Sequence, residues 1–247
     1  MSASEEGKIE TIAAQLREHI KRGDFGTNGR LPTVTELAKE YQIARATMYQ
    51  SLTLLRSEGL LIVKGTSYYA RYPVMRIPGS PLFDKFLLKQ GLTPVTDNLV
   101  EPEIVPAPAD VAVSLGVPEG TQVIHRTRRQ GTAEVPYRLH ENWYPLDLAE
   151  PFLEAMRQDP NLNVAGEIRK ATGIALTTIH DDIFTRLPTA EEINLLNIVR
   201  TTPVLEVRKQ FLSQEGRIVV FVRSVLVGAY FQLSYDYPHV RESQPES

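Results

Sequence analysis

The sequence predicts an α+β protein of two units, a small helical unit at the N-terminus and a larger mixed α/β sheet unit after it. The chain has 247 residues, which is more than one domain usually holds. Its first part has apolar residues at helical spacing, whereas residues beyond about 91 alternate between strand-like and helix-like runs. A stretch rich in proline and glycine, Tyr72–Pro81, lies between the two patterns and is the expected linker.

Charge is divided unequally along the chain, although its net charge is only −3. Residues 8–76 hold eleven Lys and Arg against six Asp and Glu, a balance of +5, and the rest hold sixteen against twenty-four, a balance of −8. A basic segment joined to an acidic body is expected when one end of a protein meets phosphate groups. The chain has no cysteine, which excludes disulfides and thiolate metal sites. It has no signal-peptide pattern and no long apolar run, so we expect a cytoplasmic protein with no membrane partner.

The N-terminal unit is expected to hold three helices. Apolar residues at helical spacing predict the first over Ile9–Ile20. Thr33 stands three residues before Glu36, the spacing of a capping box, which predicts a second helix over Val34–Tyr41. The third is expected over Arg45–Ser57, where the apolar residues of the expected buried face follow one another every three or four positions.

A hairpin should follow the third helix, with strands over Leu60–Val63 and Tyr68–Arg71 around a tight turn. Three short helices and a hairpin make a winged helix-turn-helix, whose third helix lies in the major groove of DNA. Arg45 and Tyr49 share the exposed face of that helix, because they are four residues apart. The alternative is that this face is merely solvated. The residues assigned to DNA binding are Thr33, Thr35, Arg45, Ala46, Thr47, Tyr49, Gln50, Lys64, Gly65 and Thr66.

A single set of residues, in a defined order and spacing, runs through this N-terminal unit. It comprises Ile12-Ala13, Leu16, Ile20, Gly23, Leu31-Pro32-Thr33, Glu36-Leu37-Ala38, Arg45-Ala46-Thr47, Leu52, Leu55, Glu58-Gly59-Leu60 and Gly65. With this spacing, roughly residues 9–70 resemble the DNA-binding domain of the GntR family of bacterial regulators. The family often has Arg where Thr35 and Tyr49 stand, Ser where Ala44 stands and a second wing Gly where Ser67 stands. These departures leave the operator sequence and the strength of DNA binding open.

The C-terminal unit should be a sheet with interspersed helices. Strands are expected over Leu99–Val105, Gln122–Arg129, Arg138–Tyr144, Leu176–Thr185, Val204–Leu212 and Ile218–Val227. Helices are expected over Pro81–Lys89, Pro108–Leu115, Pro151–Arg157, Val164–Ala171 and Thr189–Leu196.

Short motifs in this second unit occur in a fixed order. They are Val105-Pro106-Ala107-Pro108, Leu115-Gly116-Val117-Pro118-Glu119-Gly120, Arg126-Thr127-Arg128, Trp143-Tyr144-Pro145, Arg186-Leu187-Pro188 with Glu191-Glu192, Pro203-Val204-Leu205 and Leu233-Ser234-Tyr235. Over about residues 91–237 the chain resembles the UTRA effector domain of the HutC-type branch of the GntR family. The resemblance implies a chorismate-lyase-like α+β fold, a ligand cavity beside the sheet and a homodimer.

Together these patterns predict a division of the chain into four parts. We expect residues 1–71 to form the DNA-binding domain and residues 72–90 a linker with a lead-in helix. Residues 91–240 should form an effector-binding and dimerisation domain, and residues 241–247 a polar tail.

Two arginines are the strongest candidates for holding an effector. Arg126 and Arg128 lie two apart on a strand, so their side chains face the same side, and paired guanidinium groups suit a phosphate or a carboxylate. Relatives hold acidic or phosphorylated ligands at the matching positions, but some sugar-phosphate-sensing relatives also have a carboxylate near the position of Val220, which is apolar here. The alternative is a structural network with Glu134, Glu141 or Glu206. The residues assigned to effector binding are Arg126, Arg128, Tyr137, His140, Trp143, Arg223 and Tyr230.

The function that follows is a ligand-responsive transcription factor, expected to repress by binding a palindromic DNA operator as a dimer and to be released by a small anionic metabolite. A constitutive regulator whose second domain only dimerises is one alternative. The other is an enzyme on a chorismate-lyase-like scaffold, for which the sequence has no catalytic constellation. His180-Asp181-Asp182 offers metal ligands without an identifiable third partner, so no metal and no cofactor are expected.

Overall fold

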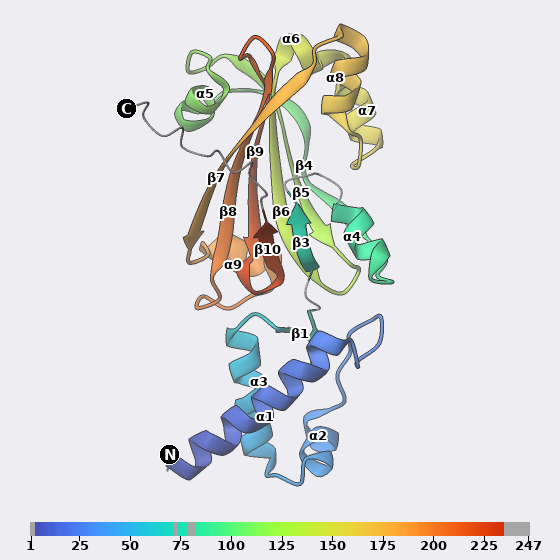
Figure 1. Ribbon diagram of the computed structural model, residues 1–247, viewed down its shortest axis with the longest axis vertical. Helices are drawn as coiled ribbons and strands as arrows, with labels where there is room; N and C mark the ends of the chain where they lie inside the picture. Colours follow the sequence, from blue (N-terminus) through green and yellow to red (C-terminus); the bar gives the residue numbers. More distant parts are fainter. Residues whose placement is uncertain (1–2, 72–73, 79–82, 235–247) are drawn as a thin grey trace, which may run out of the picture.

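The computed structural model describes residues 3–71, 74–78 and 83–234. The two units are stacked along the long axis of the molecule, with the helical unit below the sheet unit (Figure 1). Within the described residues, no helix combines the length and apolar character that a bilayer span requires.

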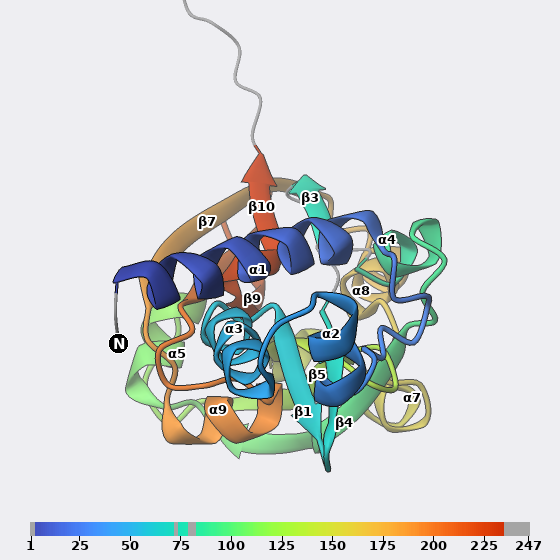
Figure 2. The same ribbon diagram turned by 90° about the horizontal axis from the view of Figure 1, so that it is seen from below.

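The N-terminal unit consists of three helices and a two-stranded hairpin, which confirms the fold class predicted for it. Leu16, Met48 and Leu52 are fully buried where the apolar faces of the helices meet. Thr33 and Glu36 form the expected capping box at the start of the second helix. Seen from below, the three helices lie together beneath the sheet (Figure 2). The elements are α1 (Ala3–Arg22), α2 (Val34–Glu40), α3 (Arg45–Ser57), β1 (Leu61–Lys64) and β2 (Ser67–Ala70).

The C-terminal unit is built on a six-stranded antiparallel sheet in the order β4-β5-β6-β9-β8-β7. Its strands are β4 (Val95–Pro106), β5 (Gln122–Gly131), β6 (Pro136–Pro145), β7 (Leu176–Arg186), β8 (Val204–Ser213) and β9 (Ile218–Val227). Each contains or overlaps one of the expected strands, because period-two alternation is a local property of a strand that a sequence displays directly. The α+β fold class is therefore confirmed for this unit as well.

Helices cover both faces of the sheet. One face packs against α5 (Ala109–Leu115) and α9 (Ala190–Leu196), and the other against α6 (Leu146–Ala149), α7 (Leu153–Gln158) and α8 (Val164–Thr172). Val123 and Ile124 show the alternation, since the first packs with the α5 cluster and the second with the α6–α8 cluster. The sheet thus has two separately covered faces, and the cavity described below lies on one of them.

The expected linker contains a strand that the sequence pattern did not predict. β3 (Val74–Pro78) pairs in parallel with β10 (Phe231–Ser234) in a small separate sheet. The pairing partner lies more than 150 residues away in the sequence, so no local pattern could reveal it. The predicted lead-in helix is present as α4 (Phe83–Lys89), whereas the expected tail, residues 241–247, lies outside the described residues.

The two units share one continuous core. The Arg71 side chain is fully buried between them and donates to the carbonyl oxygens of Gly59 at 3.2 Å and Leu196 at 2.5 Å. The Tyr230 hydroxyl donates to the same Gly59 carbonyl. The Thr202 hydroxyl donates to the Ser57 carbonyl at 3.1 Å. The end of α3 is therefore attached to the sheet unit rather than connected to it through the linker alone.

Candidate DNA-contacting surface and ligand pocket

A groove separates the exposed face of α3 from the wing hairpin. Arg45, Ala46 and Tyr49 line it from the helix, and Gly65 and Thr66 line it from the wing turn. Five residues assigned to DNA from the sequence thus lie around one concave surface. Tyr49 is 58% exposed although it is aromatic, so it is available for contact.

The remaining residues assigned to DNA lie beside this groove. Thr35 is exposed on α2, and Thr47 and Gln50 are partly exposed on α3. The Thr33 hydroxyl accepts a hydrogen bond from the Glu36 backbone as the cap of α2. Ala44, which stands where relatives often have Ser, makes no side-chain cap bond to α3. None of these observations involves a contact with DNA, so the assignment of these residues to DNA binding stays a prediction.

Lys64 is held by the sheet unit. Its ammonium group donates to the Glu134 carboxylate at 2.8 Å and to the Ala133 carbonyl at 3.0 Å, both on the turn between β5 and β6. Both charged side chains are 39% exposed, so the ion pair is weak. The wing and the β5–β6 turn are thus in direct contact in this conformation.

The candidate ligand pocket lies on one face of the sheet, and strand pairing sets its layout. In one cross-strand row, Arg126 on β5 pairs with Asn142 on β6, followed by Val222 on β9 and Lys209 on β8. The next row runs Arg128, His140, Ser224 and Val207, and a third starts Gln130, Arg138 and Leu226. Alternate residues of each strand face the same side, so these rows form the floor of a cavity of about 210 Å³.

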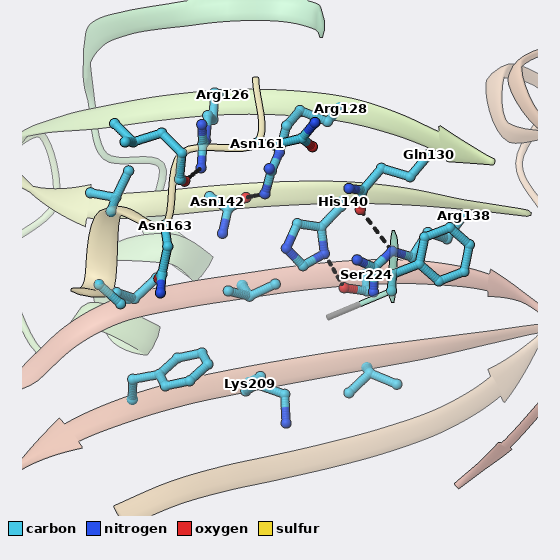
Figure 3. Close-up of a pocket in the computed structure, with 18 of the residues that line it drawn as sticks. Arg126, Arg128, Gln130, Arg138, His140, Asn142, Asn161, Asn163, Lys209 and Ser224 are labelled. Atoms are coloured by element: carbon cyan, nitrogen blue, oxygen red, sulfur yellow. Dashed lines mark hydrogen bonds between the residues drawn. The ribbon is translucent and has the colours of Figure 1, made fainter. Parts of the chain in front are cut away.

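Two other segments complete the walls of the pocket. Asn161, Leu162 and Asn163, between α7 and α8, line it at one end, and Phe83 and Asp84 on α4 also line it. Figure 3 shows Arg126 and Arg128 near the first segment and Arg138 farther along the strands, with His140 between the two groups.

Arg126 and Arg128 are both buried, with 1% and 7% of their surface exposed, and neither has an acidic partner within ion-pair distance among the described residues. Arg126 donates to the carbonyl of Leu162 at 3.0 Å and to the hydroxyl of Tyr144 at 3.2 Å. Arg128 donates to the carbonyl of Pro160 at 2.7 Å and to the side-chain oxygen of Asn142 at 2.8 Å. Their Nε atoms are buried without any hydrogen-bond partner among the residues described.

The carboxylates that could have formed a structural network with these arginines are paired elsewhere. Glu134 binds Lys64, and Glu141 binds Arg223 at 2.6 Å. Glu206 binds Arg186 and Arg208, each at 2.7 Å. The structural-network alternative raised by the sequence is therefore absent among the described residues.

Burial and mutual repulsion change the ionisation of this pocket. Burial, together with the charge of Arg126, lowers the pKa of Arg128 to about 10. Burial and the three neighbouring arginines hold the pKa of His140 well below its usual range, so its imidazole is neutral at neutral pH. Its Nδ1 lies 2.8 Å from the Ser224 hydroxyl. The pocket is thus strongly cationic, with one neutral imidazole on its floor.

Four of the residues assigned to effector binding lie away from this pocket, against our expectation. Trp143 faces the opposite side of the sheet, stacked on His125 with ring centroids 3.9 Å apart. Arg223, on that same side, is bound to Glu141 and to Asp110. Tyr137 and Tyr230 pack edge to face near the junction of the two units. Aromatic character on a strand does not distinguish a pocket wall from the core.

Other lining residues were missed, although one simple pattern could have found some of them. Arg138 and Asn142 each lie two residues from His140 on β6, so strand alternation places all three on one face. Lys209 lines the pocket too and donates to Asp181 at 2.5 Å. Asp84 belongs to a different element, and only the tertiary structure brings it here. Among the described residues, no three potential metal-ligating side chains gather into a cluster.

A winged helix-turn-helix attached to a sheet domain with a charged pocket defines a DNA-binding transcriptional regulator with a ligand-sensing domain. Residues 8–67 match the family model described as "Bacterial regulatory proteins, gntR family", and residues 89–232 match the UTRA domain. The chain therefore belongs to the GntR family of transcriptional regulators, with a UTRA effector domain, and that family consists of regulators rather than enzymes.

Relatives whose sequences align with most of this chain include repressors. The HTH-type transcriptional repressor NagR of Bacillus subtilis is 26% identical over 220 residues, covering 88% of this chain and 89% of the relative. The mannosyl-D-glycerate transport/metabolism system repressor MngR of Escherichia coli is 26% identical over 219 residues, covering 86% and 88%. The crystal structure of PhnF from Mycobacterium smegmatis shares the fold, with a TM-score of 0.61 at 24% identity, covering 92% of this chain and all of that one.

Proposed function

We propose that this chain is a repressor that binds a palindromic operator as a dimer and is released by a small anionic metabolite. The observation that carries the proposal is the pair of buried arginines, Arg126 and Arg128, whose described partners are all neutral. A buried cation without a counter-ion is costly, and a bound phosphate or carboxylate would offset that cost through charge-assisted hydrogen bonds.

In this proposal, strands β5 and β6 connect the pocket to the DNA-binding unit. These strands carry Arg128 and His140 on the pocket floor, and the turn that joins them carries Glu134, which binds Lys64 on the wing. A ligand changes DNA affinity only by binding one arrangement of the two units better than another. In this proposal the contact between the wing and the turn forms in one of these arrangements and is broken in the other.

Dimerisation is supported by the exposed edge of the sheet. β7 pairs with β8 on one side only, and Ile179, Ile183 and Phe184 on it are 41–47% exposed. An open edge strand of eleven residues is a template for pairing with a second strand. We place a two-fold axis at Asp181, because antiparallel pairing there sets Ile179 opposite Ile183 of the partner subunit and His180 opposite Asp182 of the partner subunit.

The experiment that tests the anion assignment uses a double variant, Arg126→Gln with Arg128→Gln. Anionic and neutral metabolites are first screened for thermal stabilisation of the full chain, and the hits are tested for release of operator DNA. The double variant should bind the operator as the wild type does and should not release it. Arg129→Gln is the matched control, because Arg129 lies on the same strand with its guanidinium bound to Asp97 at 2.8 Å.

Two results would contradict this assignment. One is normal release of the double variant by the same metabolite at the same concentration. The other is a screen in which every stabilising metabolite that releases DNA is neutral or cationic.

A further inference from the structure

The buried arginines of the pocket form two groups rather than one. The guanidinium groups of Arg126 and Arg128 both point toward the segment before α8, where each has a bond to the Pro160 carbonyl, at 3.5 Å and 2.7 Å. Arg138 instead contacts Gln130, its neighbour on the adjacent strand, to whose side-chain oxygen its Nε donates at 2.8 Å. The rows of Arg126 and Arg138 are four residues apart along the strands, roughly 13 Å. Figure 3 shows the two groups on either side of His140.

Arg138 is a buried cation with spare hydrogen-bond donors. Only 8% of its surface is exposed, and its guanidinium carbon lies 4.4 Å from the centre of the Phe83 ring. Its two terminal nitrogens make no hydrogen bond to any described residue, and no described carboxylate lies within ion-pair distance. Burial and the nearby charge of Arg128 lower the pKa of Arg138 to about 9, so it is still protonated at neutral pH.

The charge balance of the pocket leaves two positive charges uncompensated. Its lining holds three arginines and Lys209, against Asp84 and Asp181. Lys209 and Asp181 neutralise each other at 2.5 Å. Asp84 makes no ion pair with any described residue and has one buried oxygen without a partner, but its charge still offsets one arginine. Three arginines less one carboxylate leave a formal charge of +2.

We infer that the effector carries two separate anionic groups, one bound by Arg126 and Arg128 and the other by Arg138. The uncharged part between them lies over His140 and Val222, with Val207 beside it. This inference rests on the proposed function and deepens it, because it names the class of effector as a small molecule charged at both ends. A single phosphate dianion would balance the charge but would leave Arg138 without a partner.

The first test locates anions with selenate, whose anomalous scattering identifies it in crystals of the full chain. We expect two selenate positions in each protomer, one at Arg126 and Arg128 and one at Arg138. Arg138→Gln should lose only the second position, and Arg138→Lys should keep it. A single position in the wild type, or an unchanged second position in Arg138→Gln, would overturn the inference.

The second test asks in solution whether one molecule uses both groups. The probes are the dicarboxylates from succinate to azelate, each compared by calorimetry with its own monomethyl ester. At the length that spans the pocket, the dicarboxylate should bind at least about tenfold more tightly than its ester. Arg138→Gln should abolish that preference, and Arg129→Gln should keep it. No preference at any length in the wild type contradicts the inference.

Operator binding is measured in parallel on the same preparations. If the wild type binds no operator, the proposed regulator fails, whereas the selenate positions and the dicarboxylate preference still decide the nature of the pocket. If Arg138→Gln keeps operator binding and loses only the preference for a dicarboxylate, both proposals are supported.

Discussion

At the scale of single residues, the role of an arginine in this sheet depends on which face it occupies. Arg128 and Arg129 are neighbours on β5, but the first is buried beside neutral groups and the second forms a half-exposed ion pair with Asp97. The ion pair contributes at most about 1 kcal/mol to stability, because water screens it. The buried arginine gains more from an anion in a site from which most water is excluded. One strand therefore carries the proposed ligand anchor and a surface charge at adjacent positions.

A residue-scale prediction concerns Arg45, which is exposed at the start of α3 and lines the groove beside the wing. Arg45→Ala should weaken operator binding by roughly 1–3 kcal/mol if the guanidinium reads a base. If it contacts only phosphate, the loss should be equal on all sequences and the salt dependence shallower. Lys170→Ala, which removes an exposed cation on α8, is the control for net charge. Unchanged affinity for both operator and random DNA would remove Arg45 from the surface.

At the scale of elements, the end of α3 is where the DNA-reading helix meets the sheet unit. Gly59 follows α3 with a φ of +81°, and a Cβ built there would lie 2.8 Å from Cγ2 of Thr202. Its carbonyl accepts bonds from Arg71 and Tyr230. Only glycine satisfies both the backbone conformation and the close contact. The end of this helix is thus in direct contact with the sheet unit that holds the proposed effector pocket.

The element-scale prediction compares Gly59→Ala with Gly23→Ala in urea unfolding of the full chain. Both place alanine at a nearly equal positive φ, +81° and +79°, and each should cost roughly 1–2 kcal/mol for that reason. No atom lies within 4 Å of a Cβ at residue 23, whereas at residue 59 the Thr202 methyl must move. Gly59→Ala should therefore cost about 1–3 kcal/mol more. Equal destabilisation would show that the contact between the units is loose.

At the scale of the whole molecule, the proposed dimer would join the exposed edge strand and the helix expected to meet DNA in one assembly. One helix and one wing make few DNA contacts, whereas two copies related by a two-fold axis read two half-sites. Pairing through β7 would extend the sheet across both subunits and bury Ile179 and Ile183 at its centre. Effector binding on the same sheet could then alter the spacing of the two DNA-binding units.

The whole-molecule prediction is that Ile183→Asp gives a monomer in analytical ultracentrifugation and binds the operator much more weakly. The introduced carboxylate would face the apolar Ile179 of the partner subunit and lie diagonally across from Asp181 of the partner subunit, so that both desolvation and like charge oppose the pairing. Ile104→Asp on the opposite edge strand is the matched control, since Ile104 and Ile183 are both 41% exposed. A dimer that survives Ile183→Asp and dissociates in Ile104→Asp would place the interface at β4.

The sequence by itself determined the features that depend on local periodicity. The capping box at Thr33, the recognition helix from Arg45 to Ser57 and the shared face of Arg126 and Arg128 follow from spacings of two to four residues. Those spacings are set by the geometry of a helix or a strand and need no distant partner. The ordered motifs were enough to identify the family.

Only the tertiary structure decided which residues share the pocket and what neutralises them. Alternation shows that Arg138, His140 and Asn142 lie on one face and Tyr137 on the other, but not on which face the packed helices leave room for a cavity. The parallel pairing of β3 with β10 and the contact of Gly59 with Thr202 join segments more than 140 residues apart. Such contacts are settled by the packing of the whole chain, because neither partner carries a local pattern that specifies the other.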